Sequence, residues 1–263
     1  MGNSVIMKWN GGIRMTDLKE RDRGLKSIFN LFARSSIKKL MVLYLIMTLV
    51  EVFLFVYWVS GMRKVNVILS LSELDIWSYI RLFYGIAYLA TVFILVKSTS
   101  EKGSNSVYTL RRLSSSEKDI FIAQTLYNVG VFVILWAVQL VVILGLMVYY
   151  KSVAPIDINL GLSIFEAFHL NWSINSFLPL SDFFLYFVRI YSIIGLGMVI
   201  AGRAYKERRG RWDALLSPYL TILFFLNTSF LNKIVGIVFM LMMTVLIYQV
   251  INMVFYNSEE EMA

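Results

Sequence analysis

Six long apolar segments dominate this sequence and restrict the chain to one fold class. They lie near residues 40–60, 79–97, 122–148, 183–202, 214–230 and 234–256. Each is close to the roughly 20 apolar residues that an α-helix needs to cross the hydrocarbon core of a bilayer. Because lipid offers no hydrogen bonds to the backbone, such segments are expected to be helical. We therefore predict an all-α, polytopic membrane protein with six transmembrane helices.

Six spans of about 20 residues each would place nearly half of the chain in lipid, which leaves no room for a second soluble domain of ordinary size. Charged residues make up 16% of the chain, against about 25% in soluble domains. We expect residues 1–23 to form a cytoplasmic arm and residues 24–263 to form a single six-helix transmembrane domain. The net charge of +8 lies beside the apolar segments, so anionic membrane lipids are the expected partner and nucleic acid is not.

The basic residues alternate in density between successive connections. The arm through Lys39 and the connections 97–118 and 203–211 contain 19 Lys and Arg residues, whereas the alternate connections contain four. The four are Arg63, Lys64, Lys151 and Lys233. Because connections rich in Lys and Arg stay on the cytoplasmic side, both termini are predicted to be cytoplasmic.

Two stretches outside the apolar segments have helical apolar stripes. Gly24–Ser36 carries Leu25, Ile28, Phe29 and Phe32 at helical spacing. This pattern predicts an amphipathic helix on the inner membrane surface, and the alternative is a cytoplasmic extension of the first span. Between residues 150 and 182, a second stripe predicts a short helix on the outer leaflet. Its members are Gly161, Ile164, Phe165, Phe168 and Trp172.

The third span has a marked beginning and is longer than a bilayer requires. Ser114-Ser115-Ser116-Glu117 interrupts a short helical pattern over Val107–Leu113, and a Ser followed by Glu can cap a new helix. We expect that helix to run from about Glu117 to Tyr149, with its first turns in the cytoplasm.

No catalytic, metal or nucleotide motif is present in the sequence. The single histidine is His169, cysteine is absent, and no HExxH, GxSxG or GxxxxGK[ST] pattern occurs. Zinc proteases, serine hydrolases and P-loop nucleotide binding therefore have no basis in this chain. We predict that the chain is not an enzyme and holds no catalytic residue, metal or cofactor of its own.

Ionisable residues within the apolar segments mark a candidate polar site. Such residues are costly in lipid and usually have a partner. At about 1.5 Å per residue, Glu51 lies roughly 13 Å and Arg189 about 9 Å below the outer ends of their spans. We hypothesise a Glu51–Arg189 pair. The alternative is that Glu51 is protonated, or bonded to a hydroxyl or backbone group. Arg81 is a weaker candidate for its partner, since its side chain can extend outward to the membrane surface.

Glycines are concentrated in the fourth span. Gly195, Gly197 and Gly202 lie close to Ala201, and the Gly197-xxx-Ala201 spacing favours close approach of another helix. We interpret this stripe as packing rather than substrate contact.

The stretch EKGSNSVYTLRRLSSSEKDIFIAQTLYN over Glu101–Asn128 resembles the loop between spans two and three of bacterial ABC-2-type transporter permeases. The matching pieces are Gly103-Ser104, Leu110–Leu113 and Ser116 before the third helix. The sequence departs from that pattern where Ser114 replaces a common Pro and where the long outer segment follows span three.

The resemblance implies a permease subunit in the bacterial cell membrane, exporting a peptide-like, drug-like or lipid-like substrate. It implies two copies of a separate ABC ATPase, which binds ATP and Mg, and a second permease subunit, identical or related. The loop would be a cytoplasmic coupling helix over Val107–Lys118. Its expected ATPase contacts are Tyr108, Leu110, Arg111, Arg112, Leu113, Ser116 and Lys118.

Two other functions remain open from the sequence. One is an ATP-independent secondary transporter or channel that uses Glu51 and Arg189 as a polar path. The other is a membrane sensor or assembly factor that moves no substrate.

Overall fold

The structure, a computed structural model, describes residues 15–64, 70–100, 116–153, 160–178, 183–208 and 233–255. Its elements are α1 (Met15–Lys64), the 3-10 helix η1 (Leu71–Glu73), α2 (Ile76–Ser100), α4 (Glu117–Val153), α5 (Leu160–Leu170), α6 (Trp172–Asn175), α7 (Phe183–Arg208) and α9 (Lys233–Phe255). By length and composition, five of these helices could each cross a membrane: α1, α2, α4, α7 and α9. The all-α prediction is confirmed for the described residues. Five of the six predicted spans coincide with these helices, and the span near 214–230 lies outside the described residues.

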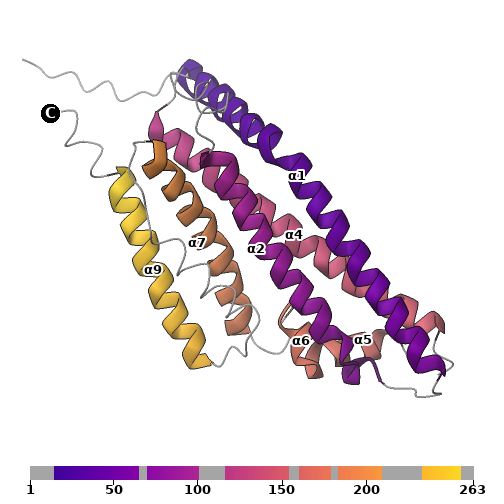
Figure 1. Cartoon of the computed structure of the whole chain (residues 1–263). Coiled ribbons are helices and arrows are strands. Elements are labelled where there is room, and N and C mark those ends of the chain that lie inside the picture. Colours follow the sequence, from indigo (N-terminus) through magenta and orange to yellow (C-terminus); the bar gives the residue numbers. More distant parts are fainter. Residues whose placement is uncertain are drawn as a thin grey trace, which may run out of the picture.

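The helices form an elongated bundle in which α4 lies between α1 and α7, and α9 packs on the far side of α7 (Figure 1). Helices α7 and α9 run in the same direction, since Gly195 faces Met243 and Gly202 faces Val250.

The two ends of the bundle differ in charge. The end that we call the basal end holds the beginnings of α1 and α4 and the ends of α2, α7 and α9 (Figure 1). Its basic residues in the described helices are Lys19, Arg21, Arg23, Lys26, Arg34, Lys38, Lys39, Lys97, Lys118, Arg203, Lys206 and Arg208. The described beginning of α1 and the described end of α9 both lie there (Figure 1), as a chain with both termini on one side requires. That this side is the cytoplasm stays a prediction.

The first helix corrects one expectation. Gly24–Ser36 is not a separate surface helix but part of the uninterrupted helix α1, so the alternative, an extension of the first span, holds. The apolar stripe of this segment packs on α4 rather than on lipid alone. Ile28 and Phe32 are buried, and the hydroxyls of Ser36 and Tyr127 share a hydrogen bond of 2.5 Å. The stripe predicted the helix correctly, but Ile28 and Phe32 are covered by protein, whereas Phe29 stays partly exposed.

Short helices close the opposite end, which we call the cap end (Figure 1). The predicted short helix is present as α5, followed by α6; α5 packs beside η1, and α6 packs beside α5 and α2. Asn171 caps α6 by accepting from the backbone nitrogens of Ser173 and Ile174, and its Nδ2 donates to the Ser72 carbonyl at 2.8 Å. Phe168 is buried, whereas His169 is exposed and stacks on Phe165.

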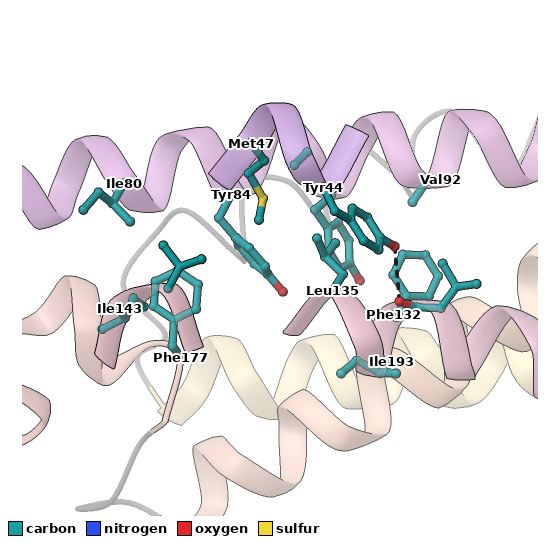
Figure 2. Close-up of a cluster of buried hydrophobic side chains, with 14 of the residues drawn as sticks. Tyr44, Met47, Ile80, Tyr84, Val92, Phe132, Leu135, Ile143, Phe177 and Ile193 are labelled. Carbon is teal, nitrogen blue, oxygen red and sulfur yellow. Dashed lines mark hydrogen bonds between the residues drawn. The ribbon is translucent and has the colours of Figure 1, made fainter. Parts of the chain in front are cut away.

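The interior of the bundle is rich in aromatic residues. Tyr84 meets Phe177 edge to face at 4.9 Å, and Tyr88 packs on Phe132 at 5.0 Å between ring centroids. Figure 2 shows Tyr44 and Tyr84 with their hydroxyl oxygens inside this apolar cluster. These rings place hydroxyl groups in the middle of the bundle. Each needs a hydrogen-bond partner there, because a buried hydroxyl is costly without one.

Candidate functional site

A buried polar cluster lies where α1, α2, α4 and α7 meet. The side chain of Glu51 on α1 is fully buried, at 0% exposure, and so is that of Gln139 on α4. Gln139 Nε2 donates to Glu51 Oε2 at 2.9 Å. An acidic residue near the middle of a span needs such a partner, and the structure supplies it from α4. The Glu51–Arg189 pair stays a prediction, since the hydrogen bond given to Glu51 comes from Gln139.

Arg189 reaches the same cluster from α7. Its guanidinium lies 5.7 Å from the centroid of the Phe177 ring and interacts electrostatically with Tyr84 and Tyr88 on α2. Tyr84 also lies in the neighbourhood of Glu51. The two members of the hypothesised pair therefore share one neighbour, Tyr84, and the cluster joins four helices through polar side chains.

Arg81 is placed differently from the expectation. We expected its side chain to extend outward to the membrane surface, but the residue is 4% exposed. Its guanidinium lies over the Trp172 ring, 4.5 Å from the centroid, because α6 folds across the end of α2. The expectation was wrong because the connection after span three forms a protein cap at this position. Arg81 and Arg189 are near enough to interact electrostatically.

Two further buried contacts fix α4 against its neighbours. The Tyr44 hydroxyl on α1 donates to the Val131 carbonyl at 3.3 Å (Figure 2). Asn128 Nδ2 donates to the Gly197 carbonyl on α7 at 3.2 Å. Gln139 and Asn128 were missed by the sequence reasoning, which searched for charges in the spans. Amide side chains inside an apolar segment are the signal that could have found them.

The glycines of α7 provide the close approach that their spacing predicted. A Cβ on Gly197 would lie 2.6 Å from Val129 Cγ2 on α4, and one on Gly202 would lie 2.7 Å from Val250 Cγ1 on α9. Gly195 faces Met243, also on α9. Since neither neighbouring helix leaves space for a side chain, the interpretation of this stripe as packing is confirmed.

The basal end holds a second group of polar contacts, around the first turns of α4. Ser116 Oγ accepts from the Asp119 backbone nitrogen at 3.1 Å and donates to its carboxylate at 2.7 Å, as an N-cap residue does. The predicted start at Glu117 is therefore confirmed. Glu117 Oε2 lies 3.4 Å from Arg208 Nη2 on α7, and Arg208 Nη1 donates to Gln124 at 3.2 Å.

The predicted coupling segment is only partly described. Ser116 caps α4, and Lys118 lies in its first turn, with its ammonium 5.6 Å from the centroid of the Phe255 ring on α9. The other expected contact residues lie outside the described residues: Tyr108, Leu110, Arg111, Arg112 and Leu113. The described end of the segment is thus anchored to both α7 and α9.

Comparison with known proteins assigns no family to this bundle. No protein-family model, no curated protein and no solved structure matches the chain.

Proposed function

We propose that this chain is the membrane-spanning permease subunit of an exporter driven by a separate ATPase. The observation that carries the proposal is the continuous helix α4, which begins directly after the loop that resembles ABC-2-type permeases. Its 37 residues correspond to about 55 Å, against a hydrocarbon core of about 30 Å. One rigid element therefore extends from the loop to the interior of the bundle.

The contacts of α4 suit the transmission of movement. Its first turns are capped by Ser116 and linked to α7 by the Glu117–Arg208 ion pair. Further along, the same helix holds Asn128 against Gly197 and Gln139 against Glu51. A displacement of the loop would thus reach α7 first and the buried polar cluster next.

The proposed partners follow from the loop. Two copies of an ABC ATPase, which carry the ATP and Mg, would bind the coupling segment of two permease chains, identical or related. Arg111 and Arg112 would make charge-assisted hydrogen bonds to acidic groups on the ATPase, with Tyr108, Leu110 and Leu113 packing beside them. The aromatic interior suits a peptide-like, drug-like or lipid-like substrate.

The test is whether ATP hydrolysis accompanies the chain. An affinity-tagged chain is purified from native membranes in mild detergent, and vanadate-sensitive ATP hydrolysis is measured in the eluate. We expect activity with the wild-type chain and its loss in the double variant Arg111→Glu/Arg112→Glu. The matched control is Lys26→Glu/Lys38→Glu, which makes the same charge change at two exposed positions of α1 and should retain the activity.

Expression level and topology are checked in all variants. Since the chain has no cysteine, a single introduced cysteine reports its side of the membrane through impermeant labelling. ATP hydrolysis absent from the wild-type eluate, or lost equally in both double variants, would contradict the proposal.

The buried polar cluster favours one alternative, an ATP-independent transporter or channel. Glu51, Gln139 and Arg189 place polar groups near the middle of the bundle, where a polar path would run. This alternative predicts ion or solute flux through the purified chain alone in liposomes, abolished by Glu51→Leu. The permease proposal predicts no such flux without an ATPase.

A further inference from the structure

The contact between Glu51 and Gln139 leaves two oxygen atoms unexplained. Gln139 Nε2 donates to Glu51 Oε2. The remaining carboxyl oxygen, Glu51 Oε1, and the amide oxygen, Gln139 Oε1, are both buried and have no hydrogen-bond partner among the described residues. Both atoms are acceptors when Glu51 is ionised, so neither can satisfy the other. A buried acceptor without a donor requires an explanation.

One proton accounts for both atoms at once. A protonated carboxyl group has one O–H donor and one acceptor oxygen, and a primary amide has the complementary pair. With a proton on Oε1, Glu51 donates to Gln139 Oε1 while Gln139 Nε2 donates to Glu51 Oε2. We propose that Glu51 and Gln139 form a proton-binding site, in which the bound proton closes a two-point acid–amide pair between α1 and α4.

The ionisable side chains around the pair are mostly tyrosines, with a cationic arginine on the α7 side. The ionisable side chains that share this part of the core are Tyr44 of α1, Tyr84 and Tyr88 of α2, Tyr149 and Tyr150 of α4 and Arg189 of α7. Tyrosine is neutral at physiological pH. Arg189 interacts with Tyr84 and Tyr88 and lies over Phe177.

The site makes the α1–α4 contact sensitive to pH. Loss of the proton leaves a buried carboxylate beside an amide oxygen, with one hydrogen bond in place of two. The contact is therefore stronger at low pH and weaker at high pH. This conclusion does not depend on an ATPase partner, so its failure and the failure of the proposed function are separate results.

Infrared difference spectroscopy tests the protonation directly. For the purified chain in lipid at neutral pH, we expect the carbonyl stretch of a protonated carboxylic acid, above the amide I band. The band should disappear in Glu51→Gln and shift to higher frequency in Gln139→Leu, because the acid then loses its hydrogen-bond partner. The spectrum of Glu73→Gln is the control, since Glu73 is a surface residue at the cap end and should leave the band unchanged.

Unfolding at several pH values tests the consequence. Wild-type stability in mixed micelles should fall as the pH is raised from mildly acidic to alkaline, through loss of the bound proton. Glu51→Gln should have a much smaller dependence, since two amides can form the same two-point pair without a proton. A missing carboxylic acid band at neutral pH would overturn the proposal. So would a stability that responds to sodium rather than pH and loses that response in Glu51→Gln, because a small cation would then fill the site.

Discussion

The contact between α7 and α4 at Gly197 allows a quantitative prediction. A Cβ added to Gly197 would lie 2.6 Å from Val129 Cγ2, 3.2 Å from the Val129 backbone nitrogen and 3.4 Å from the Thr125 carbonyl oxygen. The valine side chain can rotate, but the two backbone atoms belong to α4 and move only with the helix. Gly197→Ala therefore has to separate α4 from α7 by a few tenths of an ångström. The hydrogen bond from Asn128 to the Gly197 carbonyl, 3.2 Å long, would lengthen as well.

The magnitude follows from two opposing contributions. Inserting a methyl group into a well-packed interface costs about 1–3 kcal/mol, whereas replacing Gly by Ala in a helix gains about 1 kcal/mol. The expected net loss for Gly197→Ala is therefore about 0–2 kcal/mol.

Gly130 on α4 is the matched control, because nothing lies within 4 Å of a Cβ added there. Gly130→Ala should keep the gain in helix propensity without the clash. The two variants should differ by about 1–3 kcal/mol, which is about a 5- to 140-fold difference in the unfolding equilibrium constant.

The assay is reversible unfolding in mixed micelles with a rising fraction of sodium dodecyl sulfate, followed by tryptophan fluorescence. We expect the order Gly130→Ala, wild type, Gly197→Ala from most to least stable. Equal stability of the two variants would refute the close approach of α7 to α4 and the packing interpretation of the glycine stripe.

Three further predictions concern the two ends of the bundle. Ser116→Ala should lower the free energy of unfolding by about 1 kcal/mol through loss of the helix cap, and it should speed amide exchange in the first turn of α4. Ser116→Thr should do neither. Unchanged amide exchange in both variants would contradict the capping role. Glu117→Gln should cost at most about 1 kcal/mol, since its carboxylate is 45% exposed. Arg208→Met should lower the free energy of unfolding by about 1–3 kcal/mol, since Gln124 also loses a hydrogen-bond donor. An equal loss of stability for Glu117→Gln and Arg208→Met in micelle unfolding would argue against the contact between Arg208 and Gln124. Trp172→Ala should destabilise the cap by about 0.5–2 kcal/mol by removing the aromatic face over Arg81, and Trp172→Phe should lose less in thermal unfolding.

Hydropathy predicted the long helices well because their lengths and apolar composition are properties of single segments. The start of α4 was also predictable, since Ser116 and Asp119 form a local cap that needs no tertiary contact. The continuity of α1 was not, because an amphipathic stripe identifies a helix without identifying the surface that it covers. Ile28 and Phe32 would look the same in sequence whether they faced lipid or α4. The burial of Arg81 was missed for a related reason, since Trp172 is distant in sequence and reaches it only through the cap.

Depth in the membrane was not enough to predict the partner of Glu51. Axial rise places a residue at a height in the membrane, and by that measure Glu51 and Arg189 are compatible. Height does not say which faces of two helices meet, and the structure turns Glu51 toward α4, where Gln139 donates to it.

At 100° per residue, Gln124, Asn128 and Gln139 project within about 60° of one another, so they form an amide stripe on a helix that lies between α1 and α7. Amides carry no charge and so escape a search for ion pairs, yet in a buried site they can both donate and accept. A carboxylic acid paired with an amide gains a second hydrogen bond when it binds a proton. A carboxylic acid paired with an arginine instead gains its hydrogen bonds when it releases its proton. The identity of the partner on α4 therefore determines which protonation state of Glu51 holds α1 and α4 together.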